Sequence, residues 1–219
     1  MERKVEPELL DDDCGTPAEI AAALADIRRV NRWFGGVQTS ECLVRRIVDE
    51  LGLREVELLD VACGSGDVPL ALSRRLERQG VRLRSTLLDR SAAHLPALPR
   101  AMVGDALALP FPPQSFDLVS CSLFLHHLEP ATIQLFVREA LRVARLALVI
   151  NDLLRSRLHL ALVLAGRPLF RSRMAWHDGV VSVRRAYTEP ELRRLLGGAG
   201  SRLEFSRHYL QRLGVIVWK

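Results

Sequence analysis

The sequence predicts an α/β fold in which helices cover both faces of a mostly parallel sheet. Short apolar runs alternate with segments of helical spacing from about residue 56 onward, which is typical of this class. Three acids, Asp60, Asp89 and Asp105, stand where the runs are expected to end. The chain has 219 residues, of which 48% are hydrophobic, so it is long enough to bury one sizeable core.

The first 50 residues are predicted to form a helical cap. Pro17 to Val30 has helical spacing, with Thr16 as N-cap and Pro17 at the first helical position. Asn31 to Gly36 interrupts the pattern, and Ser40 to Leu51 resumes it. Residues 51–219 are then expected to form the main domain, with a lid over the ligand pocket near residues 153–187.

Seven strands are expected in the main domain, the last two forming an antiparallel hairpin. The predicted strands are Val56 to Val61, Leu83 to Leu88, a short run ending at Val103, Asp117 to Cys121, Ala147 to Ile150, Arg202 to Arg207 and Val215 to Trp218. The predicted helices of this domain are Val68 to Gln79, Ala131 to Val143, a helix that Asp152 caps before Leu153, and Thr188 to Leu196.

A glycine loop follows the first strand and points to a nucleoside ligand. Gly64 and Gly66 tolerate positive φ and carry no Cβ, so the backbone can approach a ligand closely. Asp89 ends the second predicted strand, where an acid accepts hydrogen bonds from both hydroxyls of a ribose.

The residues around the glycines decide between nucleoside ligands. Pro69 stands where a dinucleotide-binding loop has its third glycine, and Asp67 would repel a pyrophosphate. No Gly-Lys-Ser/Thr follows, which excludes a P-loop. A loop rimmed by acids instead suits the sulfonium and amino groups of S-adenosylmethionine.

The run from Asp60 to Gly66 resembles motif I of class I S-adenosylmethionine-dependent methyltransferases, with Ala62 in place of the commoner first glycine. Gly104 to Phe111 and Ser115 to Val119 resemble the ubiquinone/menaquinone-methyltransferase-like branch, the type 11 methyltransferase domain. The resemblance implies a Rossmann-like fold, S-adenosylmethionine as cofactor and S-adenosylhomocysteine as product. The cofactor-binding residues that we expect are Arg32, Asp60, Ala62, Gly64, Gly66, Asp89, Arg90, Asp105, Ala106, Ser122 and His126.

Three residues are candidates for catalysis. His127 follows the fourth predicted strand, and its imidazole has a pKa suited to accepting a proton near neutral pH. His177 is a second candidate base, and Asn151 is expected to orient the acceptor. A structural interpretation is also open, in which the adjacent histidines point in different directions.

The acceptor is expected to be small and hydrophobic because Leu153 to Phe170 is rich in leucine. Trp176 to Tyr187 is predicted to be a loop over the acceptor, in which Arg184 or Arg185 holds a carboxylate or phenolate. A charged edge strand fits the same residues equally well. O-methylation of a phenol, quinol or polyketide-like ring is the first hypothesis, and C-methylation of a quinone ring or methylation of RNA are the alternatives.

Composition narrows the expected partners. The net charge of +5 is spread along the chain and only 5% of residues are aromatic, so we do not expect nucleic acid as a partner. The N-terminal residues are charged and the cysteines lack C-x-x-C spacing, which favours a cytoplasmic protein with reduced thiols. We expect no membrane span, no metal site, because no set of carboxylates indicates Mg²⁺, and a monomer or homodimer.

Overall fold

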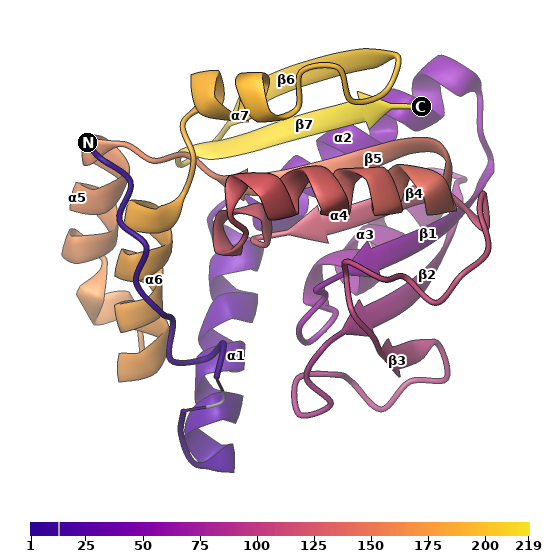
Figure 1. Cartoon of the computed structure of the whole chain (residues 1–219). Coiled ribbons are helices and arrows are strands. Elements are labelled where there is room, and N and C mark those ends of the chain that lie inside the picture. Colours follow the sequence, from indigo (N-terminus) through magenta and orange to yellow (C-terminus); the bar gives the residue numbers. More distant parts are fainter. Residues whose placement is uncertain (13) are drawn as a thin grey trace.

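The computed structural model describes residues 1–12 and 14–219. Its seven strands form one sheet in the order β3-β2-β1-β4-β5-β7-β6 (Figure 1). The five strands from β1 to β5 run parallel, whereas β7 lies antiparallel to both β5 and β6. The sheet confirms the predicted fold class, including the antiparallel C-terminal hairpin. The strands are β1 Glu55–Val61, β2 Arg82–Asp89, β3 Ala101–Val103, β4 Phe116–Ser122, β5 Ala144–Leu153, β6 Arg202–His208 and β7 Arg212–Trp218.

Helices cover both faces of the sheet and gather at one end of it (Figure 1). The α-helices are α1 Pro17–Trp33, α2 Gly36–Leu51, α3 Asp67–Glu77, α4 Pro130–Val143, α5 Arg157–Ala165, α6 Arg173–Arg185 and α7 Glu189–Leu195. Two short 3₁₀ helices are η1 Leu125–His127 and η2 Arg167–Leu169. Within the described part of the chain, no helix is long and apolar enough to cross a membrane.

Alternation along the strands builds two hydrophobic cores. In β1, Leu58 packs with α2 and α3 on one face, whereas its neighbour Leu59 packs with α4 and α7 on the other. Both side chains are fully buried. Successive strand residues point to opposite faces, so one apolar run serves both cores. Helix α2 packs in the core that contains Leu58, on a face of the sheet. Of residues 1–50, only those before α2 therefore lie at the end of the sheet.

Residues 1–12, which we call the N-terminal strap, run along α6 toward α1 (Figure 1). The backbone N–H groups of Leu9 and Leu10 donate to the two carboxylate oxygens of Asp178, at 2.9 and 3.0 Å. Arg3 Nε donates to the carbonyl of Arg185 at 2.8 Å. The strap is therefore attached to α6 by polar contacts along its length.

The prediction for Trp176 to Tyr187 was wrong, because residues 173–185 form helix α6 and neither a loop nor an edge strand. Ser172 caps the helix by accepting from the backbone N–H of Ala175. The paired arginines Arg184 and Arg185 suggested an exposed segment, but they end a helix whose other face buries Val180 and Val181. Burial of this apolar face, and not local composition, decides the structure here.

The prediction that Asp152 caps a helix beginning at Leu153 was also wrong. Strand β5 continues through Leu153, because it pairs with β7 as far as Arg212. Helix α5 begins only at Arg157 and is capped by Ser156, whose side chain accepts from the N–H of His159. The carboxylate of Asp152 is thereby free to serve the neighbouring η1 turn.

Candidate functional site

A cavity of about 460 Å³ opens beside the carboxyl ends of β1, β2 and β4. The strand order reverses here, because β1 pairs with β2 on one side and with β4 on the other. Ligands of doubly wound sheets bind at such a switch point. The volume lies in the range of small-molecule sites.

The residues that follow two adjacent strands, β1 and β4, have left-handed backbone conformations at this cavity. Ala62 follows β1 with φ of 53°, and Leu123 follows β4 with φ of 56°. For a residue with a Cβ, this left-handed conformation costs roughly 1–2 kcal/mol of conformational free energy relative to the right-handed one. Both residues line the cavity, and strain of this kind is concentrated at functional sites.

The glycine loop presents its backbone to the cavity. An added Cβ at Gly64 would meet no atom within 4 Å, whereas at Gly66 it would lie 2.7 Å from the side chain of Leu87. The N–H of Gly64 donates to Asp89 Oδ2 at 2.8 Å, and the N–H of Ser91 donates to Oδ1 at 2.9 Å. Asp89 thus joins the end of β2 to the loop after β1.

Asp60 is a buried acid at the floor of the cavity, only 3% exposed. Burial raises its pKa to about 7, and the charges of Asp67 and Asp89 act in the same direction. A hydrogen bond from the hydroxyl of Ser120 opposes these effects. The site therefore holds an acid that a cationic ligand would help to ionise.

The other predicted cofactor residues are placed as follows. Ala106, Ser122, Asp105 and Arg90 line the same cavity, and Asp105 Oδ1 accepts from the N–H of Leu107 at 2.8 Å. Arg32 is exposed and does not line it.

A buried arginine stands near the glycine loop instead. Arg212, at the start of β7, is 2% exposed and lines the cavity. Its Nη2 donates to Asn31 Oδ1 at 3.1 Å, and Asn31 Nδ2 donates to Asp67 at 3.1 Å. Its Nη1 has no hydrogen-bonding partner among the described residues. Burial lowers the pKa of Arg212 to about 10, so the guanidinium is still charged at neutral pH.

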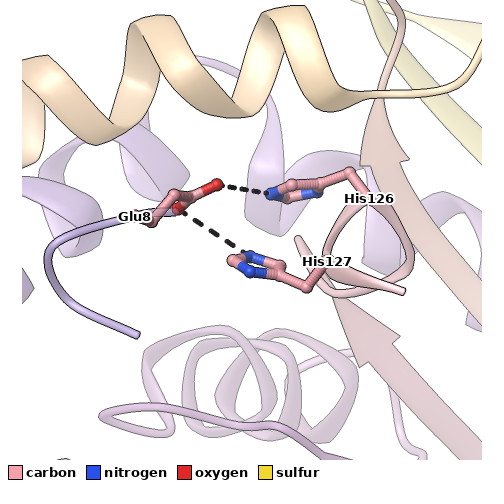
Figure 2. Close-up of side chains that lie close together, drawn as sticks. All are labelled: Glu8, His126 and His127. Carbon is pink, nitrogen blue, oxygen red and sulfur yellow. Dashed lines mark ion pairs between the residues drawn. The ribbon is translucent and has the colours of Figure 1, made fainter. Parts of the chain in front are cut away.

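Glu8, His126 and His127 form a cluster in the same cavity (Figure 2). Glu8 comes from the N-terminal strap and both histidines from η1. Glu8 Oε1 lies 3.5 Å from His126 Nε2, and Oε2 lies 3.9 Å from His127 Nε2. The histidine rings are 4.2 Å apart, so these neighbours point the same way and not in different directions.

Each ring of the cluster is oriented by a further carboxylate. His126 Nδ1 lies 2.7 Å from Asp152 Oδ1, and His127 Nδ1 lies 2.8 Å from Asp11 Oδ2. Burial by itself lowers the pKa of His126, but Asp152 and Glu8 outweigh burial and raise the pKa to about 10. His126 thus lies between the carboxylates of Asp152 and Glu8.

The remaining predicted residues divide between the cavity and its surroundings. Arg185 lines the cavity and donates to the carbonyl of His127 at 2.6 Å. His177 points away from it, with a side chain 48% exposed, and Arg184 does not line it. Asn151 is buried behind the cavity, where its Nδ2 donates to Gly36 O and Ser40 Oγ. Its place therefore indicates that it joins β5 to α2.

Apolar side chains surround the cluster. They come from the strap, α1, the turn after β4, α5, the end of η2 and α6: Leu10, Leu24, Ile27, Val30, Phe124, Leu128, Val163, Phe170, Ala175 and Val183. This end of the cavity suits a hydrophobic ligand that carries one polar group.

Sequence reasoning missed Glu8, Asp11 and Arg212. The two acids lie in an acidic N-terminal segment whose only signal was its charge, and Arg212 is one of many arginines. They reach the site only because the strap lies against α6 and because β7 pairs with β5.

Residues 59–146 match a family model described as a methyltransferase domain. A 2-phytyl-1,4-naphtoquinone methyltransferase of Thermosynechococcus vestitus is 42% identical over 69 residues, which is 27% of this chain and 29% of that protein. A demethylmenaquinone methyltransferase of Staphylococcus aureus is 30% identical over 90 residues, which is 38% of this chain and 37% of that protein. The alignments thus span about a third of each curated relative.

The fold is shared more widely than the sequence. A crystal structure of a SAM-dependent methyltransferase from Aquifex aeolicus superposes with a TM-score of 0.56 at 20% identity. The match covers 80% of this chain and 88% of that one. The sheet and helices described above therefore form a fold that this chain shares with that solved structure.

Asp60→Asn should stabilise the ligand-free protein increasingly as pH rises. The folded protein raises the pKa of Asp60 from 3.8 to about 7, so it binds this proton more tightly than the unfolded chain does. Ionisation therefore costs stability between these values, and the full cost is present above pH 7. Asparagine avoids the cost and still accepts from Ser120. Thermal unfolding at pH 5 and pH 8 should show the larger gain at pH 8, and an equal gain at both would contradict the raised pKa.

Proposed function

We propose that this chain, which carries a class I S-adenosylmethionine-dependent methyltransferase domain, methylates a hydroxyl oxygen of a small apolar acceptor. A phenol, a quinol or a polyketide-like ring has the required chemistry. The observation that carries this proposal is the cluster of Glu8, His126 and His127 at the apolar end of the cavity. Oxygen nucleophiles lose a proton as they are methylated, and the cluster offers groups that accept one.

The cofactor's nucleoside is proposed to lie over the glycine loop. Asp89 would accept from the ribose hydroxyls, while Asp105 and Ala106 would flank the adenine. These positions come from the resemblance, and the shared cavity supports them. Asp60 and Asp67 provide negative charge for the amino and sulfonium groups.

Arg212 is proposed to bind the carboxylate of the cofactor's methionine part. Its guanidinium is buried, charged and has an Nη1 without a partner in the described chain. A carboxylate would satisfy that group and compensate its charge. Arg32, which the sequence analysis favoured for this end, is exposed and outside the cavity.

The transfer itself is an in-line displacement. The acceptor oxygen forms a bond to the methyl carbon as the bond from that carbon to sulfur breaks, giving a methyl ether and S-adenosylhomocysteine. The hydroxyl proton passes to the cluster and then to solvent. The apolar walls align the reactants and exclude water, which contributes up to about 7–11 kcal/mol in well-oriented systems.

C-methylation of a quinone-like ring is a second candidate, favoured by the two curated relatives, whose names are those of naphthoquinone and menaquinone methyltransferases. The two reactions differ in product. Incubation with methyl-labelled S-adenosylmethionine and a panel of phenols, quinols, naphthoquinols and RNA, followed by mass spectrometry, would identify the acceptor. Label in a methyl ether supports the O-methylation proposal, and label on a ring carbon supports the second candidate. A lack of label in every acceptor while RNA becomes labelled would contradict both.

Arg212→Met should weaken binding of S-adenosylhomocysteine at least tenfold but leave methylthioadenosine binding unchanged. Methylthioadenosine has the same nucleoside and thioether but lacks the amino-acid carboxylate, so it does not use the proposed contact. Calorimetry with both ligands on the same preparation separates binding from folding. Equal weakening of the two ligands would instead mean that Arg212 supports the fold.

His127→Gln should lower turnover by about 10²–10⁴-fold while S-adenosylmethionine binds with nearly wild-type affinity, because the proton-accepting ring is lost but the glycine loop is intact. His208→Gln is a matched control, since His208 lies on β6 outside the cavity. Steady-state rates and calorimetry on both variants test this prediction. If His127→Gln turned over at the wild-type rate, His127 would not be the group that accepts the proton.

A further inference from the structure

We propose that Glu8, His126 and His127 bind one divalent transition-metal ion, with Zn²⁺ as the ion that fits their chemistry best. The three residues offer two imidazole nitrogens and one carboxylate. Their ligand atoms all lie within 4.8 Å of one another. Two histidines and a glutamate form the ligand set of one class of catalytic zinc site. The sequence predicted no metal site because it contains no set of carboxylates that indicates Mg²⁺, whereas this ligand set depends on two histidines.

The Nε2 atoms of the two histidines are directed at the same carboxylate (Figure 2). His126 Nε2 is buried and makes no hydrogen bond to any described residue, although Glu8 lies 3.5 Å away. A buried nitrogen of this kind calls for a partner. A metal ion between the three residues would provide it.

Both rings are already oriented as metal ligands are. The Nδ1 atoms of His126 and His127 contact Asp152 and Asp11, at 2.7 and 2.8 Å. A histidine that binds a metal through one nitrogen typically donates its other N–H to a carboxylate, which fixes the ring. Here each of the two rings has such a carboxylate.

The ligand atoms lie somewhat further apart than in a tetrahedral site. Zinc bonds of about 2.0–2.1 Å place neighbouring ligands about 3.3 Å apart. Here Glu8 Oε1 lies 3.5 Å from His126 Nε2 and Glu8 Oε2 lies 3.9 Å from His127 Nε2, and one ligand atom from each residue falls within 4.8 Å of the others, so the side chains would close in around the ion. Glu8 stands on the N-terminal strap and is also held by Ser182, whose hydroxyl donates to Oε1 at 2.8 Å.

The charges around the cluster also favour a cation. Glu8, Asp11 and Asp152 place three carboxylates around two imidazoles. Two arginines approach the carboxylate of Asp11, Arg185 at 3.6 Å and Arg90 at 4.0 Å. A proton on His126 and a divalent ion are alternative ways to compensate this charge. Protons and metal compete for such ligands.

The ion would leave one coordination position open toward the cavity, since all three ligands line it. This part of the inference rests on the proposed function. With the ion in place the two rings would no longer accept the acceptor's proton. An acceptor hydroxyl bound to the ion would instead lose its proton directly to solvent, and the resulting oxygen anion would attack the methyl carbon. The metal ion is not consumed.

Direct metal binding tests the site without any acceptor. Tag-free protein carrying Cys14→Ser and Cys42→Ser, which removes the two exposed thiols, is treated with a chelator and titrated with Co²⁺ and with Zn²⁺. We expect one ion per chain by calorimetry, and a visible Co²⁺ spectrum typical of a tetrahedral nitrogen and oxygen site. Zn²⁺ should displace the Co²⁺.

Variants show whether these three residues hold the ion. Glu8→Gln and His127→Gln should each weaken Zn²⁺ binding by at least about tenfold, and Asp11→Asn, which acts through His127, by about tenfold. Glu77→Gln on the exposed side of α3 and His208→Gln on β6 are matched controls and should bind as the parent does. Circular dichroism verifies that every variant is folded.

The result that overturns the inference is the absence of one-to-one binding, or equal binding in the Glu8→Gln and His127→Gln variants and the controls. In that case the cluster is an ion pair between a protonated His126 and its carboxylates. S-adenosylmethionine binding is measured on the same samples. Cofactor binding without metal binding overturns this inference alone, whereas metal binding without cofactor binding contradicts the proposed function alone.

Discussion

The carboxylate of Asp152 fixes the η1 turn, which carries the two histidines of the cluster. It accepts from the backbone N–H of His126 at 3.1 Å and contacts the ring of the same residue at 2.7 Å. Both residues are almost fully buried, so the loss of either partner would leave an uncompensated charge, typically at a cost of 3–5 kcal/mol. This pair fixes η1 against the end of β5. Both histidines of η1 thereby face Glu8, which the strap's contacts with α6 hold in place.

The site concentrates features that a stable fold would otherwise avoid. Asp60 is an acid buried at the end of a strand, Ala62 and Leu123 have left-handed backbones, and Arg212 is a buried cation. Each has an energetic cost that the two hydrophobic cores offset. The same features place an acidic group, backbone atoms accessible to a ligand and a buried guanidinium around one small cavity. Stability is thus exchanged for a preorganised ligand site.

Local patterns in the sequence were sufficient for the sheet and for the loop after β1. Asp60 and Asp89 end predicted strands, and the structure has β1 ending at Val61 and β2 at Asp89, with both acids lining one cavity. Local patterns were insufficient for residues 173–185, where the arginines suggested a loop or a charged edge strand but the chain forms helix α6. They also gave no indication of Glu8 or Arg212. Those residues enter the site through contacts between segments far apart in the chain, which no local spacing records.

The path of the N-terminal strap has a consequence for how relatives are compared. The matched methyltransferase domain covers residues 59–146, which include both histidines of η1 but neither Glu8 nor Arg212. A comparison limited to that shared region includes the glycine loop but not the carboxylate of Glu8, which completes the cluster with the two histidines. The chemistry of this cluster can therefore differ between homologues whose central domains remain easy to recognise. Alignments of the flanking segments, and above all of the acid at position 8, are what would sort such homologues into groups.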